Sequence, residues 1–274
     1  MNEIQQKARD LLACFVRVCG QLDIPYYLVC GTALGAVKYS GFIPWDDDID
    51  VGLLRPDYEK FLEKAPALIP EGVFLQNYRT DPAFPQPYSK LRDSNTTFIE
   101  ENKAHLPINH GIYIDIFPID GYPEKRGEQK LLEWRKRILS WKWGCALNGE
   151  RRGVSRLHCA FFRAIGCHKR TDRLLARFER VISAWPVTDA KVWCNHGNWQ
   201  RELEYAPREQ YGSGAMAVFE GIEVIVPERF DEYLTQKYGD WRSDPPTDAQ
   251  KSHHGVLIAD ASKPFTEYLS EAKK

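Results

Sequence analysis

Four aspartates fall within five positions of an otherwise apolar segment, 41-GFIPWDDDIDVGLL-54. They are Asp46, Asp47, Asp48 and Asp50. Carboxylates this close together repel one another, and a buried carboxylate is costly unless it is paired or bound to a metal ion. The chain as a whole has a formal net charge of only −1, so this concentration of negative charge needs a local explanation. The segment predicts a site that binds a cation.

A strand from Asp46 to Leu53 would order these aspartates by face, because side chains alternate along a strand. Asp46, Asp48 and Asp50 then share one face, and the apolar residues between them anchor the strand in the core. Two such carboxylates can hold one divalent ion, and ligands that are all oxygen favour Mg²⁺ or Mn²⁺ together with substrate phosphates. The alternative is an acidic turn whose aspartates are solvated or cap the next helix.

The segment before the aspartates favours the metal site. Gly31 and Thr32 stand between a short strand pattern at 26–29 and a helical pattern at 33–39. Backbone N–H groups at such a helix start, with the positive end of the helix dipole, attract phosphate. A lone Gly-Thr pair is usually only a turn. Followed by a strand with Asp-apolar-Asp, however, it is similar to the signature of the nucleotidyltransferase superfamily.

That superfamily normally places a third acid on a later strand. The best candidate is Asp115 in 111-GIYIDIFPID-120, where it alternates with apolar residues. The alternative is an aspartate at a strand end with a structural hydrogen bond.

The hydrophobic pattern along the chain predicts an α/β protein with a mixed α+β sheet. The resemblance to the nucleotidyltransferase superfamily implies that residues 1–124 form a nucleotidyltransferase-fold core. Residues 125–274 are expected to form a mainly helical region with a basic segment and a C-terminal tail that packs on the core. The expected helices cover 3–21, 33–39, 55–68, 227–238 and most of 126–185, and the expected strands cover 26–29, 46–53, 73–78, 88–92, 97–100, 111–117, 204–205, 217–219 and 222–226.

Composition is that of an ordinary globular protein, with 43% hydrophobic and 27% charged residues. No apolar run approaches the roughly 18–20 residues that span a bilayer. The N-terminus is amphipathic and carries acids, unlike a signal peptide. The seven cysteines form no CxxC pair, which favours reduced thiols over a disulfide framework. We therefore expect a cytoplasmic protein.

Positive charge is concentrated between residues 125 and 180, which carry 16 Lys and Arg against 5 Asp and Glu. The helical stretch 128-EQKLLEWRKRILSWKWG-144 interleaves tryptophans with basic residues, a pattern that suits an anionic membrane interface. We expect residues 125–180 to make peripheral contact with the inner face of the membrane. The alternative is a helix whose tryptophans are core and whose charges are solvated. No nucleic-acid-reading motif accompanies the basic residues, so we expect no nucleic-acid partner.

A zinc site could be drawn from the cysteines and histidines of the same region, but their spacings are irregular for zinc and disfavour it. These residues are Cys145, His158, Cys159, Cys167 and His168.

Several segments resemble the LicD family, which includes the fukutin-related proteins. They are 30-CGTALGAVKYSGFIPWDDDIDVGLLRPDYEKF-61, 88-YSKLRDSNTTFIE-100, 111-GIYIDIFPIDG-121 and 238-YGDWRSDPP-246, the last followed by His253. The Ile-Pro-Trp-Asp-Asp-Asp-Ile-Asp run is highly specific. The sequence departs from the family where Cys30 replaces the usual glycine and Lys38 the usual arginine. Lysine keeps the charge but loses the bidentate fork of arginine.

The resemblance implies transfer of a phospho-alcohol from a CDP-activated donor to a sugar hydroxyl, with CMP as the leaving group. The best-known donor is CDP-choline, and the acceptor is a cell-surface glycan or its lipid-linked precursor, as in lipopolysaccharide, teichoic acid or capsule. CDP-ribitol is the donor of the animal relatives. Two rival hypotheses are a conventional nucleotidyltransferase that releases pyrophosphate from an NTP, and a catalytically inactive homologue that acts by binding.

The resemblance also implies roles for individual residues. Asp48 and Asp50 would hold Mg²⁺ or Mn²⁺ against the diphosphate, with Asp46 as a further ligand or close neighbour. Asp115 would complete the site as a metal ligand or as the base for the acceptor hydroxyl.

The same reasoning predicts three kinds of substrate contact: phosphate contacts, cations for the diphosphate and aromatic residues for choline. Phosphate would meet Gly31, Thr32 and His253. Cations for the diphosphate would be Lys38, Lys90 and Arg92. An aromatic cage for choline would draw on Trp45, Tyr113, Tyr88 and Trp241. Each has an ordinary alternative, because single basic residues are often solvated and aromatic residues often pack in the core.

Overall fold

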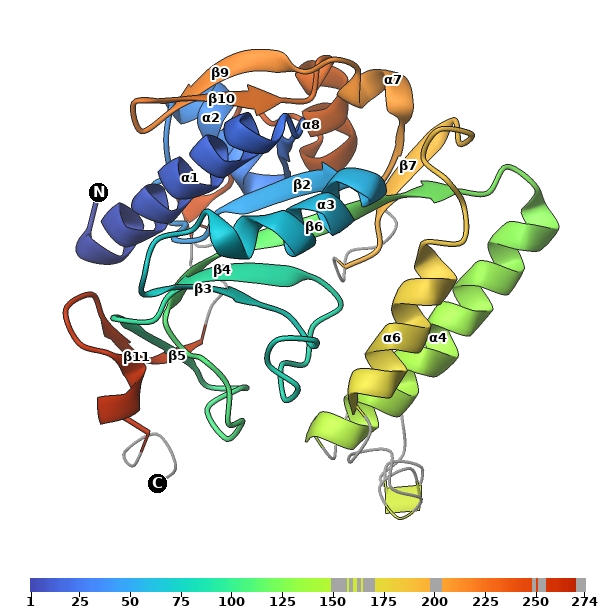
Figure 1. Ribbon diagram of the computed structural model, residues 1–274. Helices are drawn as coiled ribbons and strands as arrows, with labels where there is room; N and C mark the ends of the chain where they lie inside the picture. Colours follow the sequence, from blue (N-terminus) through green and yellow to red (C-terminus); the bar gives the residue numbers. More distant parts are fainter. Residues whose placement is uncertain are drawn as a thin grey trace.

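A mixed β-sheet is the centre of the molecule in the computed structural model, which describes residues 1–148, 171–197, 204–247 and 255–269 and the single residues 157, 160, 161, 164 and 250 (Figure 1). The strand order is β1-β2-β6-β4-β3, with β7 paired to β6 and β8 to β7. Strands β2 and β6 are parallel, and the other pairs are antiparallel. The bounds are β1 Tyr27–Leu28, β2 Asp50–Leu54, β3 Val73–Gln76, β4 Ser89–Asp93, β6 Ile112–Tyr122, β7 Val192–Asn195 and β8 Tyr205–Pro207. The expected mixed α/β class is confirmed.

Helices α1 (Glu3–Leu22) and α3 (Arg55–Lys64) lie across one face of this sheet (Figure 1). A short 3-10 turn, Ala65–Ala67, follows α3. Helix α2 (Cys30–Tyr39) packs against β2, against α8 (Phe230–Tyr238) and against the β9 strand of a separate hairpin. That hairpin consists of β9 (Ala215–Phe219) and β10 (Ile222–Val226), and the short helix α7 (Arg208–Tyr211) precedes it. Both ends of α2, which starts at the expected phosphate turn, are therefore fixed by packing.

The start of α1 is closed by reciprocal hydrogen bonds. The Asn2 side chain accepts from the Gln5 backbone N–H at 2.8 Å, and the Gln5 side chain accepts from the Asn2 N–H at 2.9 Å. Such a capping box satisfies N–H groups that the first helical turn leaves without partners.

We expect Asn2→Ala to lower the free energy of unfolding by about 1 kcal/mol, because the N-cap acceptor is lost. Urea unfolding followed by circular dichroism measures the change. Gln6→Ala, which leaves the cap intact, is the control. An unchanged midpoint in Asn2→Ala would show that the cap contributes nothing to stability.

The described residues after 125 form strands as well as helices. Helices α4 (Arg126–Asn148) and α6 (Thr171–Ile182) pack together, but β7 extends the main sheet and β11 (Val256–Asp260) pairs with β5 (Thr97–Glu100). The short 3-10 helix η5 (Phe265–Glu267) follows β11. The sequence pattern missed β7 and β11, because both are four or five residues long and contribute to sheets through distant partners. The domain boundary near residue 124 stays a prediction.

A buried ion pair joins α6 to the sheet. Arg55 donates two hydrogen bonds of 2.7 Å to Asp120 of β6, whose side chain is fully buried, and a third of 3.0 Å to Glu179 of α6. A bidentate pair of this kind fixes orientation as well as distance. Among the described residues, no helix is both long enough and apolar enough to cross a bilayer.

Candidate active site

Three charged side chains occupy one row across three neighbouring strands. Asp50 of β2 is in register with Asp115 of β6, and Asp115 is in register with Lys90 of β4. Adjacent strands lie about 5 Å apart, so residues in register are close neighbours. Three residues that the sequence assigned to the site are therefore brought together by the sheet. We call Asp50, Asp115 and Lys90 the charged row.

The expected strand at 46–53 is wrong at its beginning. Strand β2 starts only at Asp50, and residues 46–49 form an irregular segment after a turn at 44–45. The Asp46 N–H donates to the Ile43 carbonyl at 2.9 Å, and Gln5 of α1 donates to the Asp46 carbonyl at 2.9 Å. These bonds replace the ladder bonds of a strand. Asp46 and Asp48 therefore approach Asp50 from a loop and not from one face of a strand.

Burial and mutual repulsion act on these carboxylates together. Burial, and then the charge of Asp48, raise the pKa of Asp46 to about 8. The pKa of Asp50 is also well above its ordinary value, first because it is buried and then because Asp48 and Asp115 are near. Crowded acids of this kind are relieved by a cation. The electrostatics fit a divalent ion at this place.

The donor set fits Mg²⁺ or Mn²⁺, because it consists of carboxylate oxygens. In the described part of the chain, no three His, Cys, Asp or Glu side chains are arranged as a ready-made metal cage. Magnesium usually binds through one or two carboxylates plus substrate phosphates and water, and does not need such a cage. Asp48 and Asp50 are the residues that would hold it, with Asp46 beside them.

Lys90 is a buried partner of Asp115. Its Nζ lies 2.5 Å from Asp115 Oδ1 and 3.1 Å from the centre of the Tyr113 ring. Burial lowers the pKa of Lys90 to about 8, although the charge of Asp115 opposes the shift. Burial likewise raises the pKa of Asp115, while Lys90 acts to lower it. The lysine therefore stabilises the charged form of the carboxylate.

Arg92 has internal partners on both sides. It donates at 2.5 Å to the Gln76 side chain and at 2.5 Å to the Gly111 carbonyl, and its guanidinium lies 4.7 Å from the centre of the Tyr113 ring. These contacts tie β3, β4 and the start of β6 together. Contact of Arg92 with the diphosphate stays a prediction, and so does the place of Tyr113 in a choline cage.

The start of α2 lies directly against the aspartates. A Cβ on Gly31 would sit 3.0 Å from Asp46 Oδ2, and the Thr32 hydroxyl oxygen accepts the Asp50 N–H at 2.8 Å. The Thr32 O–H is thus still able to donate to a phosphate. Cys30 has a φ of +52°, a left-handed conformation that favours glycine. This geometry explains why a glycine would suit the position.

We expect Gly31→Ala to lower kcat/KM for the transfer about 10-fold without lowering stability, because the added methyl displaces the Asp46 carboxylate while alanine favours the helix. Steady-state kinetics and thermal unfolding measure the two effects. Gly20→Ala in α1 is the matched control, because a Cβ there meets nothing within 4 Å. Unchanged kinetics in Gly31→Ala would show that Asp46 has no part in the site.

Lys38 and Trp45, two further predicted residues, both lie beside Tyr39. Lys38 is in an ion pair of 2.5 Å with Asp244 and donates to the Trp241 carbonyl at 3.2 Å, so it ties α2 to the C-terminal tail. Trp45 is half-buried, with its ring centroid 6.4 Å from that of Tyr39. His253 lies outside the described residues, as do most members of the disfavoured zinc set.

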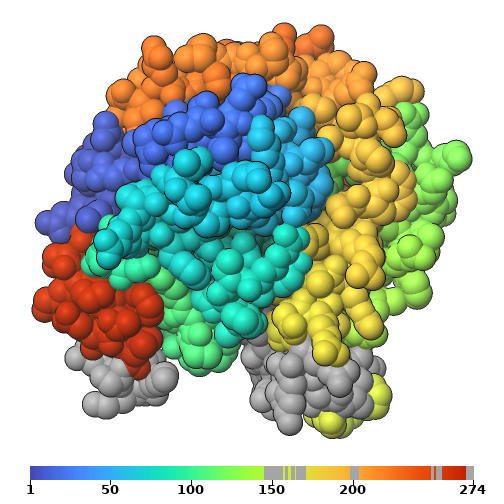
Figure 2. Space-filling view, viewed as in Figure 1, coloured from blue at the N-terminus to red at the C-terminus, as the bar shows by residue number. Residues whose placement is uncertain are grey.

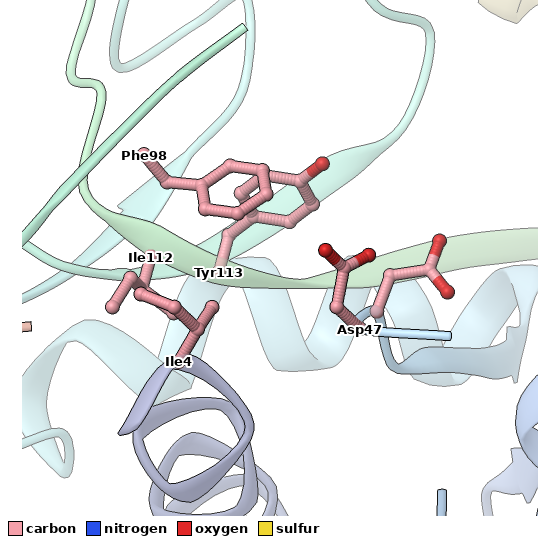
Figure 3. Close-up of a pocket in the computed structure, with 6 residues that line it drawn as sticks. Ile4, Asp47, Phe98, Ile112 and Tyr113 are labelled. Carbon is pink, nitrogen blue, oxygen red and sulfur yellow. The ribbon is translucent and has the colours of Figure 1, made fainter. Parts of the chain in front are cut away.

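A small pocket adjoins the aspartates. Its lining residues are Ile4, Asp47, Asp48, Phe98, Ile112 and Tyr113. Figure 3 shows the Asp47 carboxylate on one side and Phe98, Tyr113, Ile112 and Ile4 on the other. The sequence analysis missed Ile4, Phe98 and Ile112 as site residues, because their periodicity marks them only as apolar faces of a helix and strands.

Comparisons with known proteins identify similar sequences. The family described as LicD/FKTN/FKRP, nucleotidyltransferase domain, matches residues 23–139, a span that contains the charged row. The lipopolysaccharide cholinephosphotransferase LicD of Haemophilus influenzae is 28% identical over 93% of this chain and 96% of its own length. A local match to the ribitol-5-phosphate transferase FKTN of Mus musculus is 33% identical and covers 20% of this chain and 12% of that protein. Residues 23–139 therefore carry a domain of the LicD family.

Proposed function

We propose that the chain transfers phosphocholine from CDP-choline to a hydroxyl of a cell-surface glycan and releases CMP. The observation that carries the proposal is the register of Asp50 with Asp115, beside the other aspartates and the start of α2. Similarity along nearly the whole chain to a lipopolysaccharide cholinephosphotransferase supports it. At the coarser level the chain is a transferase of phosphate-containing groups.

The small pocket favours choline over ribitol as the transferred alcohol. Its wall combines two aromatic rings with two carboxylates, and both attract a quaternary ammonium.

The chain's own residues bind and orient the reactants in this proposal. The backbone N–H groups at the start of α2 and the Thr32 hydroxyl bind phosphate oxygens. Asp48 and Asp50 hold Mg²⁺ or Mn²⁺, which neutralises charge on the diphosphate when bound.

Asp115 accepts the proton of the acceptor hydroxyl as the oxygen–phosphorus bond forms and the bond to CMP breaks. Lys90, at 2.5 Å, keeps Asp115 charged before that transfer.

The test is CMP release from CDP-choline, CDP-ribitol and CDP-glycerol, measured with Mg²⁺ and with EDTA in the presence of a lipid-linked glycan extract. We expect metal-dependent CMP from CDP-choline and much less from the other two donors. CMP from CDP-ribitol alone would overturn the assignment of choline. Pyrophosphate from an NTP without CMP would replace the proposal by a conventional nucleotidyltransferase. No release from any donor or NTP would favour an inactive binding homologue.

A further inference from the structure

One face of α4 carries tryptophans and basic residues and points away from the rest of the protein. Helix positions three, four and seven apart share a face. The residues of this face, which we call the α4 stripe, are Lys130, Leu131, Trp134, Arg137, Ile138 and Trp141. Trp134 is 60% exposed, Leu131 43% and Trp141 41%, which is unusual for large apolar side chains that follow one line.

The opposite face of α4 is occupied. Leu132, Lys136 and Ser140 are buried, and Lys136 Nζ lies 2.9 Å from both Glu133 Oε1 and His196 Nδ1. Trp143 packs on Phe178 of α6 with ring centroids 5.6 Å apart. Lys136 and Trp143 thus serve the internal structure, although the sequence pattern grouped them with the surface residues. The α4 stripe is the face of the helix that these internal contacts leave exposed.

The charge around the stripe is positive. Arg135, Arg137 and Lys130 are exposed on α4. Glu133 lies off the stripe, held by Lys136 and by the Tyr205 hydroxyl at 2.7 Å. The face combines interfacial aromatic residues with cations, and its own positions carry no acid.

We propose that the α4 stripe docks on the surface of an anionic lipid bilayer. Tryptophan prefers the boundary between headgroups and acyl chains, and nearby lysines and arginines are attracted by anionic headgroups. In Figure 1, α4 is the outermost element at its edge of the molecule, beyond α6, and Figure 2 shows its green surface at the same margin. A flat surface can therefore approach the helix from the side opposite the sheet. The inference does not depend on the proposed reaction.

Vesicle sedimentation of the full chain tests the proposal. The two lipid samples are phosphatidylcholine alone and equal parts of phosphatidylcholine and phosphatidylglycerol. We expect binding only to the mixed vesicles, and weaker binding at high salt because the headgroup charge is screened.

Two double variants separate the contribution of the tryptophans to vesicle binding from that of the basic residues. Trp134→Ala with Trp141→Ala is expected to lower the partition coefficient at least about tenfold. Lys130→Gln with Arg137→Gln is expected to lower it about 25-fold. The matched control is Met216→Ala with Val218→Ala, which removes apolar side chains of 65% and 45% exposure from β9 and should change nothing.

Three results would overturn the proposal. The full chain would fail to bind mixed vesicles, or the tryptophan variant would bind them as the full chain does. Alternatively, sedimentation velocity would show that the full chain self-associates and that the tryptophan variant does not, which would assign the stripe to a second copy of the chain. CMP release measured on the same samples separates loss of docking from loss of the reaction.

Discussion

Replacing Asp50 by asparagine is expected to lower the rate of CMP release from CDP-choline on the order of 1,000-fold. Asp50 combines two properties at the site: it is in register with Asp115, and it lies beside Asp48 in the buried acidic group. Asparagine keeps the shape but removes the charge that a divalent ion requires of its ligand. The measurement is a CMP-release assay at saturating donor over a series of Mg²⁺ concentrations.

Thermal unfolding of the same variant distinguishes a lost ligand from a lost fold. Asp50→Asn should be at least as stable as the parent in EDTA, because one member of a mutually repelling group becomes neutral. Mg²⁺ should raise the Tm of the parent and leave that of the variant nearly unchanged. Asp10→Asn, at an exposed position of α1, is the control. A variant that keeps a tenth of the parent rate would remove Asp50 from the metal site.

Replacing Lys90 by methionine is expected to lower the free energy of unfolding by about 3–5 kcal/mol, because Asp115 would lose its partner in a buried position. Methionine fills a similar volume, so the loss reports the charge and not a cavity. CMP release should fall as well, since the lysine keeps Asp115 in its charged form. Urea unfolding and the CMP assay on one preparation give both values.

A double variant isolates the contribution of the Lys90–Asp115 ion pair to stability. Lys90→Met with Asp115→Asn should recover most of the lost stability, because neither charge is then left alone, while the activity stays absent. If the double variant is no more stable than Lys90→Met, the loss comes from packing around Tyr113, and the ion pair is not its cause.

Sequence reasoning found elements whose pattern is local. Helix α1 was expected at 3–21 and observed at Glu3–Leu22, because its apolar residues recur at helical spacing and are buried. Strand β10 was expected and observed at 222–226. Strands β7 and β11 escaped, because their four or five residues become strands only by pairing with β6 and β5. What makes these two segments strands is pairing with β6 and β5, and their own residues do not reveal it.

The candidate site likewise combines residues that a local sequence pattern predicts with features that depend on distant partners. The aspartates, Gly31 and Asp115 could be named from composition and order along the chain. The irregular segment at Asp46 could not, because it depends on a hydrogen bond from Gln5 of α1. The pairing of Lys90 with Asp115 depends on the register between β4 and β6, which no single segment determines.

The parallel pairing of β2 with β6 also has a consequence for how the protein folds. Parallel neighbours need a long crossover, and here α3, β3, β4 and β5 all lie between the two strands along the chain. The entropy of closing such a loop must be overcome before the contact forms, so the meeting of Asp50 and Asp115 belongs to the slow, non-local part of folding. In a chain in which only the N-terminal helices and hairpins have formed, Asp50 and Asp115 are still apart, and the repulsion between these two carboxylates arises only in the final compaction. Divalent cations should accordingly slow unfolding more than they speed folding.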